Sequence, residues 1–149
     1  MKVIPASASH SDLIASFQVK MALETENLVL DPITVGRGVK AVFDNPEKGA
    51  YYIAVDENGA VAGCLLTTYE WSDWRNGSVL WIQSVYVIPE FRGKRIFSLL
   101  YLHIKSMVEK SDAFSGIRLY VDNTNLNAQE VYKAVGMNGE HYTLFEWMK

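Results

Sequence analysis

The amino-acid sequence predicts an α/β fold in which helices pack on a mixed central sheet. Two observations lead to this prediction. In some segments apolar and polar residues alternate, as in strands, and in others apolar residues recur every three or four positions, as in helices. Turn-forming residues separate these segments. The chain's 149 residues, 49% of them hydrophobic, are enough for one sizeable core and too few for two ordinary domains. Residues 1–149 are therefore expected to form a single domain.

The amino-terminal part of the chain is expected to contain a strand and two helices. Residues 2–6 are predicted as the strand, and apolar residues at helical spacing from Leu13 to Ala22 predict the first helix. Asp31 followed by Pro32 predicts the start of the second helix, because aspartate is a favourable N-cap and proline fits the first helical position.

A hairpin is expected next, with strands over residues 51–55 and 60–69. Asn58 and Gly59 predict a tight turn between them, because both residues readily take positive φ angles. Residues 70–77 are polar and aromatic, and a loop is expected there.

Five further elements complete the predicted order. They are a strand over residues 79–88, a long helix that begins at Ile96 after a basic turn, a strand over 117–121, a helix over 125–135 that Gly136 closes, and a strand over 142–147. The resulting order is strand, two helices, three strands, helix, strand, helix, strand.

Composition and charge exclude several classes of function. The formal net charge is -3 and the basic residues are scattered apart from Arg92, Lys94 and Arg95, so no nucleic-acid partner is expected. No apolar run approaches the roughly 20 residues of a membrane span, and residues 1–20 lack the features of a secretory signal. A cytoplasmic protein without membrane contact is therefore expected. The single cysteine, Cys64, lies among apolar residues and is expected to be buried rather than nucleophilic.

The basic turn before the long helix has the features of an anion site. Main-chain N–H groups at a helix N-terminus have no intrahelical partner, and the helix dipole adds partial positive charge there. Arg92, Lys94 and Arg95 surround Gly93 in this turn, so a di- or polyphosphate would be well matched. The alternative is an ordinary solvated surface turn.

A second segment with chemical potential follows the strand predicted over residues 117–121. Asn125 and Tyr132 are seven residues apart, which is two helical turns, and therefore lie on one helix face. An amide and a hydroxyl then point the same way. The alternative for this pair is a capping asparagine and a half-buried structural tyrosine.

Together the two segments resemble the GNAT N-acetyltransferase superfamily. Arg92 matches the first position of the family turn Gln/Arg-x-x-Gly-x-Gly/Ala, and the family pattern Asn-x-x-Ala-x-x-x-Tyr-x-x-x-Gly matches at Asn125, Ala128, Tyr132 and Gly136. The resemblance implies a GNAT-like α/β (α+β) fold with a mixed central sheet of about six to seven strands flanked by about four helices. It also implies transfer of an acyl group from acetyl-CoA, the acyl-donor cosubstrate, to an amine.

The resemblance also implies roles for individual residues. The turn would bind the pyrophosphate of acetyl-CoA through Arg92, Gly93, Lys94, Arg95, Ile96 and Phe97. The preceding strand would pair with the pantetheine arm and supply an N–H donor at Val85, Tyr86 or Val87. Asn125 would line the acetyl-CoA channel, and Tyr132 would be the catalytic acid that protonates the departing thiolate.

The turn departs from the family pattern at two positions. Arg95 stands where the first family glycine belongs, and Phe97 stands where the second small residue belongs. Phe97 is expected to face the core. Because the anion would be bound by main-chain N–H groups, outward-pointing side chains would leave the site intact.

The acceptor is expected to be the amine of a small molecule or a protein. Glu24 and Glu26 are candidates for binding the cationic amine or relaying its proton, with a solvated helix end as the alternative. Trp71 and Trp74 are further candidates, because aromatic rings attract cations, although core or dimer packing explains the cluster of Tyr69, Trp71, Trp74 and Trp81 equally well.

No general base and no metal site is marked in the sequence. Gln83 and Ser84 occupy the strand region where some family members carry a glutamate. His103 and His141 are expected to be structural or exposed. The missing base, together with Arg95 and Phe97, leaves open a CoA-binding module without turnover, and a pure interaction domain is a third reading. By analogy with relatives, a homodimer is also considered.

Overall fold

The computed structural model describes residues 1–149 and contains five β-strands and four α-helices. The chain forms two compact units, Met1–Arg118 and Leu119–Lys149, and each is described by itself. The predicted mixed α/β class is confirmed, although the sheet has five strands rather than six to seven. None of the helices combines the length and the apolar character that crossing a membrane requires.

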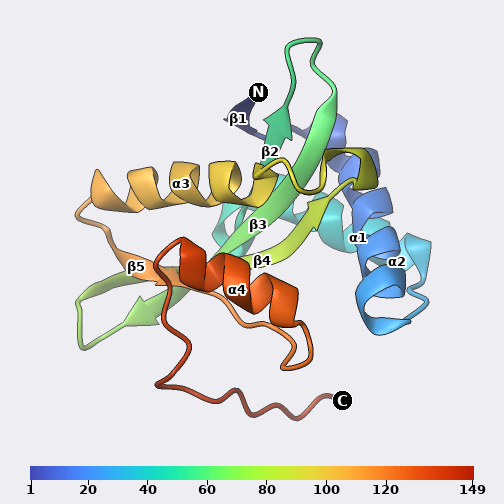
Figure 1. Cartoon of the computed structure of the whole chain (residues 1–149). Helices are drawn as coiled ribbons and strands as arrows, with labels where there is room; N and C mark the ends of the chain where they lie inside the picture. Colours follow the sequence, from blue (N-terminus) through green and yellow to red (C-terminus); the bar gives the residue numbers. More distant parts are fainter. The chain divides into compact units, whose positions relative to one another are not determined.

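The first unit is built on a five-stranded sheet with the order β1-β2-β3-β4-β5 (Figure 1). Neighbouring strands from β1 to β4 pair antiparallel, and β5 pairs parallel with β4. The strands are β1 (Lys2–Pro5), β2 (Ala50–Val55), β3 (Val61–Ser72), β4 (Gly77–Val87) and β5 (Phe114–Arg118). β5 lies earlier in the chain than the predicted 117–121, because its bounds are set by pairing with β4 and not by the local sequence, in which Ser115 and Gly116 weaken the strand signal.

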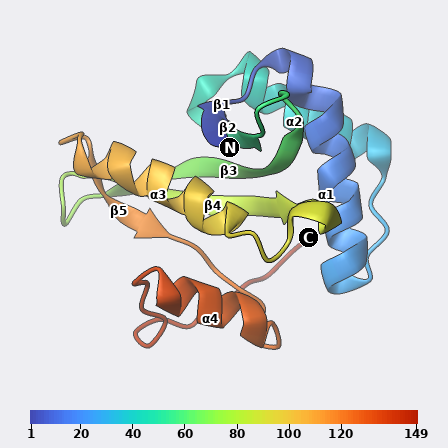
Figure 2. The ribbon, with the colours of Figure 1, turned by 45° about the horizontal axis from the view of Figure 1, so that its top comes forward.

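Helices cover both faces of this sheet. They are α1 (Ser11–Glu26), α2 (Pro32–Asp44) and α3 (Ile96–Glu109). α1 and α2 share a buried core with Ile53 of β2, whereas the neighbouring Tyr52 contacts His103 of α3 with 5.5 Å between ring centroids. Because successive side chains of a strand point to opposite faces, α3 lies on the face opposite α1 and α2 (Figure 2).

The start of α2 is built as its sequence predicts. The carboxylate of Asp31 accepts hydrogen bonds from the main-chain N–H groups of Ile33 at 3.3 Å and Thr34 at 3.0 Å. Pro32 occupies the first helical position, where its missing N–H costs nothing. The Thr34 hydroxyl also donates to the Asp31 carboxylate, and this bond, followed by the two main-chain bonds, lowers the pKa of Asp31.

The hairpin of β2 and β3 is confirmed, but the predicted tight turn at Asn58 and Gly59 is wrong. The loop is closed by the Asp56 N–H group, which donates to the Ala60 carbonyl at 2.9 Å. The Asp56 carboxylate accepts from the N–H groups of Asn58 at 2.9 Å and Ala60 at 2.8 Å. Within the loop only Gly59 has a positive φ, 83°, so the aspartate side chain and not a two-residue turn shapes this loop.

The hairpin of β3 and β4 is longer than predicted. Ser72 pairs with Gly77, so residues 70–72 lie in β3, and a loop of residues 73–76 replaces the expected loop over 70–77. Exposed polar side chains are compatible with this strand, because the antiparallel ladder satisfies their main-chain groups while one face remains solvated.

The second unit contains α4 (Leu126–Ala134), which confirms the predicted helix. Gly136, at φ 88°, ends it as predicted. Its N–H group donates to the Lys133 carbonyl at 2.9 Å, and the Met137 N–H group donates to the Tyr132 carbonyl at 3.0 Å. These two bonds form the Schellman arrangement, in which a left-handed glycine satisfies the last carbonyls of a helix.

The strand predicted over residues 142–147 is wrong, because the structure has no strand after α4. Tyr142, Phe145 and Trp147 are mostly exposed. Their aromatic side chains raise β-propensity, but a strand also needs a partner for its main-chain groups, and propensity does not supply one.

Candidate functional site

The carboxyl-terminal half of β4 contains a β-bulge. Ser84 and Val85 lie together opposite Leu65, since the register with β3 shifts there. Ser84 has a φ of 53°, in the left-handed region that serine rarely takes. On the other side of β4, the parallel ladder with β5 ends at the pair of Trp81 and Arg118.

Main-chain N–H groups of β4 change sides at this bulge. Before it, the Ser78 N–H group donates to the carbonyl of the residue preceding β5 at 3.0 Å, so even-numbered N–H groups face β5. After it, the Ile88 N–H group donates to the Ala62 carbonyl of β3 at 3.0 Å, so even-numbered N–H groups face β3. The N–H groups of Val85 and Val87 therefore face the β5 side, at a level of β4 beyond the end of the β5 ladder.

The turn between β4 and α3 presents main-chain donors at the start of a helix. Gly93, at φ 74°, and Arg95, at φ 59°, are both left-handed, and Arg95 is the N-cap of α3 without a side-chain capping bond. The first hydrogen bond of α3 joins the Leu99 N–H group to the Arg95 carbonyl at 3.0 Å. The N–H groups of residues 96–98 come before this bond and therefore have no acceptor within the helix. A side chain added at Gly93 would meet nothing within 4 Å, which means that the turn is open to solvent there.

Side chains of the turn divide between surface and core. Lys94 and Arg95 are exposed and form no ion pair, so their cations are available to an anion. Ile96 is only 5% exposed, which leaves its main chain as the part that could contact a ligand. Phe97, expected to face the core, is half-buried and stacks on Tyr101 with 6.0 Å between ring centroids.

The structure joins three residues that the sequence assigned to different parts of the site. Glu24, near the end of α1, accepts a hydrogen bond from the Tyr86 hydroxyl at 2.9 Å and pairs with the Arg92 guanidinium. Arg92 also donates to the Val87 carbonyl at 3.0 Å and lies 5.6 Å from the centre of the Tyr86 ring. This cluster could not be predicted from the sequence, because 62 residues separate Glu24 from Tyr86.

Electrostatics argue against Glu24 as a general base. The hydrogen bond from Arg92, followed by the one from Tyr86, lowers the pKa of Glu24. Desolvation and the bond to Glu24 raise the pKa of the Tyr86 hydroxyl. A carboxylate with a lowered pKa holds its negative charge and takes protons poorly, so Glu24 is suited to orienting Arg92.

Asn125 and Tyr132 both belong to α4 of the second unit. The Asn125 side-chain oxygen accepts a hydrogen bond from the Ala128 N–H group at 3.0 Å and caps the helix. The capping role that was the alternative reading of Asn125 is thus present. Tyr132 is half-buried, and this burial raises the pKa of its hydroxyl.

The tryptophan candidates lie at the other end of β4 from the bulge. Trp71 pairs with Ser78, six residues before Ser84, which corresponds to roughly 20 Å along a strand. Trp74 lies in the loop beyond and is 89% exposed. Both are therefore remote from the turn at Arg92.

The other residues considered have simple structural surroundings. Gln83 donates to the Thr68 hydroxyl at 2.6 Å, and His103 packs against Tyr52. Cys64 is fully buried as expected, and burial raises the pKa of its thiol to about 12. No group of three or more metal-ligating side chains occurs.

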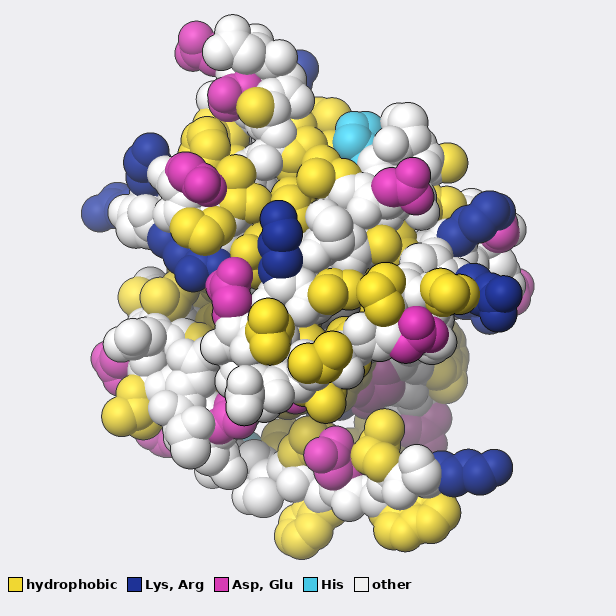
Figure 3. All heavy atoms as spheres, turned by 90° about the vertical axis from the view of Figure 1, so that its right-hand side faces the viewer, with side chains coloured by type: hydrophobic (Ala, Val, Ile, Leu, Met, Phe, Trp, Pro, Cys, Tyr) yellow, Lys and Arg dark blue, Asp and Glu magenta, His cyan; other side chains and the backbone are white.

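Glu26, at the end of α1, is exposed close to Glu24. Apolar side chains are also exposed around this end of α1 and the start of α2, on the side of the molecule that Figure 3 shows. They are Leu23, Leu28, Val29 and Ile33. An acidic and apolar surface thus borders Glu24.

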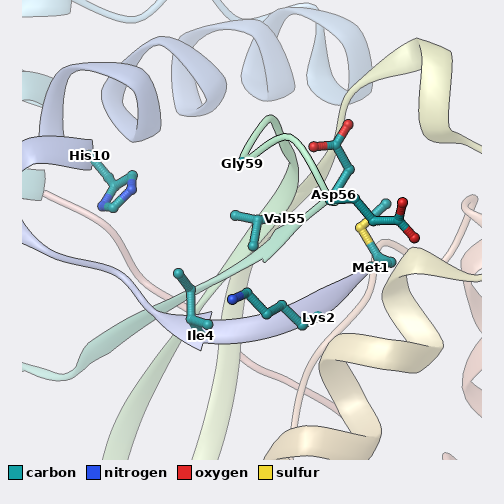
Figure 4. Close-up of a pocket in the computed structure, with 8 residues that line it drawn as sticks. Met1, Lys2, Ile4, His10, Val55, Asp56 and Gly59 are labelled. Carbon is teal, nitrogen blue, oxygen red and sulfur yellow. The ribbon is translucent and has the colours of Figure 1, made fainter.

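A surface cavity of about 530 Å³ lies elsewhere, between β1 and the loop that joins β2 and β3 (Figure 4). Lys2, Ile4 and Val55 line it, with Asp56 and His10 at its margin. The Asp56 carboxylate already accepts two main-chain hydrogen bonds within its own loop. None of the predicted site residues lines this cavity.

Comparisons with known proteins identify similar sequences and folds. The family model described as Acetyltransferase (GNAT) family matches residues 22–137. A crystal structure of a possible acetyltransferase from Clostridium difficile 630 is 39% identical, with a TM-score of 0.92, and the match covers 99% of this chain and 97% of that chain. A structure of a probable acetyltransferase is 23% identical, with a TM-score of 0.85, over 100% of both chains.

A more distant structure shares the fold alone. It is a ribosomal-protein-alanine N-acetyltransferase from Brucella melitensis biovar Abortus 2308, 11% identical with a TM-score of 0.79, and the match covers 99% of this chain and 100% of that chain. A search of curated proteins found no significant match.

Proposed function

The chain belongs to the GNAT acetyltransferase family, and we propose that it transfers the acetyl group of acetyl-CoA to an amine. The observation that carries the proposal is the turn before α3. Gly93 and Arg95 are both left-handed there, and the N–H groups at the start of α3, next to the exposed Lys94 cation, precede the first hydrogen bond of the helix. Unpaired N–H groups at a helix start, a helix dipole and cations suit a pyrophosphate, so the turn fits acetyl-CoA as its ligand.

The reaction is direct attack of a neutral amine on the thioester carbonyl. A C–N bond forms and the C–S bond breaks, with the electron pair leaving on sulfur. The nitrogen loses one proton to water or a base, and the thiolate gains one proton from an acid. The carbonyl oxygen carries negative charge in between and needs a hydrogen-bond donor.

Residues of the chain match two of these needs. The N–H groups of Val85 and Val87 face the β5 side of β4 and are the proposed donors to the carbonyl oxygen. Tyr132 is the proposed acid, because a tyrosine hydroxyl carries its proton at neutral pH and burial raises the pKa of this one. Asn125 is proposed to line the acetyl-CoA channel, a role its side-chain N–H₂ group can serve while the oxygen caps α4.

The acceptor is proposed to bind at the end of α1. Glu24 and Glu26 supply negative charge there, and exposed apolar side chains flank them. Such a surface suits an amine attached to an apolar group, on either a small molecule or a protein. Trp71 and Trp74 are left out of this proposal because of their distance from the turn.

A second candidate function is CoA binding without turnover. The missing general base supports it, because Glu24, which pairs with Arg92 of the turn, has a lowered pKa and takes protons poorly. Arg95 and Phe97, in place of small residues, support it too. In either case we propose a cytoplasmic protein without a nucleic-acid partner, with a homodimer as the assembly to test.

Two measurements on one protein preparation separate these functions. Titration calorimetry with acetyl-CoA measures binding, and a thiol-release assay over panels of small amines and peptides measures turnover. Binding with thiol release that depends on the amine supports the transferase. Binding without release across all panels supports the binding module, and absence of binding to any CoA species overturns both.

A further inference from the structure

Helix α1 places one amide side chain in the core beneath the β4 bulge. Gln18 is only 7% exposed. Its Nε2 atom donates to the Ser84 carbonyl oxygen at 3.5 Å and lies 3.7 Å from the Cys64 sulfur. The Cys64 thiol is also directed at the Ser84 carbonyl, at 3.9 Å.

The buried amide of Gln18 is unusual for the apolar side of a helix. Gln18 belongs to the buried side of α1 together with Ile14, Phe17 and Ala22, which are all apolar. Burying an amide costs free energy unless it is hydrogen-bonded, whereas leucine or methionine would fill the same space without that cost. One hydrogen bond of Gln18 goes to the Ser84 carbonyl in the bulge, and the other goes to the sulfur of Cys64 on the neighbouring strand β3. The bond to Ser84 gives a reason for the buried amide.

The peptide bond after Ser84 links this contact to the proposed reaction. The Ser84 carbonyl and the Val85 N–H group belong to one planar trans peptide and point in opposite directions. A donor that fixes the carbonyl on the α1 side therefore directs the N–H group away from α1. The Val85 N–H group is one of the two that face the β5 side because of the bulge.

The conformation of Ser84 explains why this peptide needs support. Its φ of 53° is unfavourable for any residue with a Cβ atom. Without the Gln18 amide the carbonyl keeps only the weak thiol donor of Cys64 at 3.9 Å, so the peptide can return to an extended conformation and the bulge can shift along β4. The N–H groups that face β5 would then again be the even-numbered ones, and Val85 would face β3.

We propose that Gln18 is a positioning residue of acetyl transfer, which holds the Ser84 carbonyl so that the Val85 N–H group is aimed at the thioester oxygen. This inference rests on the proposed function and deepens it. Gln18 does not contact the reacting atoms. It acts through a single peptide group, so its loss should affect the chemical step more than the binding of acetyl-CoA.

The test compares four proteins by steady-state kinetics: the wild type, Gln18→Met, the double variant Gln18→Met/Ser84→Gly, and Thr67→Val. Methionine keeps the length of the side chain and removes the amide. Glycine takes a positive φ without strain, so it should keep the bulge without Gln18. Thr67→Val is the matched control, because Thr67 is also buried and its hydroxyl donates to a main-chain carbonyl of β2, at 3.3 Å.

In Gln18→Met we expect kcat to fall at least about tenfold, since loss of a whole oxyanion donor costs roughly 100-fold or more. KM for acetyl-CoA should stay within about twofold, and Thr67→Val should keep kcat. The double variant should recover most of the lost kcat. Unchanged kcat in Gln18→Met, or no recovery in the double variant, overturns the inference. Should Gln18→Met not fold, Gln18→Asn, which shortens the reach of the amide, replaces it with the same expected outcomes.

Crystal structures of the same variants give a measurement that is independent of turnover. The φ angle of Ser84 should leave the left-handed region in Gln18→Met. Residue 84 should remain there in the double variant. If the wild type shows no turnover, the proposed function fails, and this angle still decides whether Gln18 holds the bulge. A left-handed Ser84 in Gln18→Met overturns the role of Gln18 in either case.

Discussion

Arg95 is strained, and replacing it by glycine should stabilise the protein. Its φ of 59° and ψ of 28° lie in the left-handed region, where the Cβ atom crowds the main chain. The Arg95 side chain is exposed and makes no capping bond, so nothing in the native state offsets this strain. Glycine, the residue that related turns carry here, takes the same angles freely.

The expected gain follows from two opposing effects. A residue with a Cβ atom costs about 1–2 kcal/mol in this conformation. Glycine gives back about 0.5–1 kcal/mol, because it has more freedom in the unfolded chain. Arg95→Gly should therefore raise the free energy of unfolding by roughly 0.5–1 kcal/mol, or the melting temperature by about 1–4 °C for a chain of this size.

Urea denaturation of Arg95→Gly and Arg95→Ala measures this difference. Alanine removes the same charge and keeps the strain, so it should unfold at the same urea concentration as the wild type, while the glycine variant should need more. Both variants lose one cation, and their affinity for acetyl-CoA should fall by the same factor. A glycine variant no more stable than the alanine variant would refute the left-handed conformation of Arg95.

Three further predictions concern β3, α1 and α4. Gly63→Ala should lower the free energy of unfolding by about 1–3 kcal/mol, because an added Cβ atom would lie 2.6 Å from the Tyr86 carbonyl oxygen. Glu24→Gln should cost less than about 1 kcal/mol at pH 7, since its pair with Arg92 is solvent-exposed. The pKa of Glu24 is lowered from 4.5, so this contribution is complete above pH 4.5 and is lost as the pH falls through the folded-state pKa. Tyr132→Phe should lower kcat about 100-fold and leave KM for acetyl-CoA nearly unchanged.

Each of these has its own control. Gly116→Ala should be close to neutral, because a side chain added at Gly116 meets nothing within 4 Å. The stabilities of Glu24→Gln and the wild type should converge on acidification, and a constant difference down to pH 2 would contradict the assigned ion pair. Full turnover by Tyr132→Phe would remove its role as the acid.

Local features of the fold could be predicted from the sequence. The start of α2 at Asp31 and the end of α4 at Gly136 depend on hydrogen bonds between residues at most five positions apart. The residues that make such bonds are close together in the sequence, and their chemistry alone specifies the geometry. The basic turn could also be predicted, because Arg92, Gly93, Lys94 and Arg95 are consecutive in the sequence.

Features that depend on pairing between distant segments could not be predicted. The ends of β3 and β5 are set by their register with β4, and residues 142–147 have strand-forming side chains without a strand. The pair of Glu24 and Arg92 belongs to this class as well, since it joins the end of α1 to the turn before α3. Only the fold brings these side chains together.

The β4 bulge shows why features that depend on contacts between distant segments are important for the proposed function. A sequence motif identified the turn that suits phosphate, but the direction of the Val85 N–H group depends on the offset between β3 and β4 and on an amide from α1. The left-handed conformation of Ser84 could not be predicted from the sequence, because serine rarely adopts it. The conformation there is unfavourable for its own residue and is kept by contacts from elsewhere, as is typical where main-chain groups are aimed at a ligand. A left-handed residue other than glycine, supported by a buried polar side chain, is therefore the structural sign of a positioned donor in this chain.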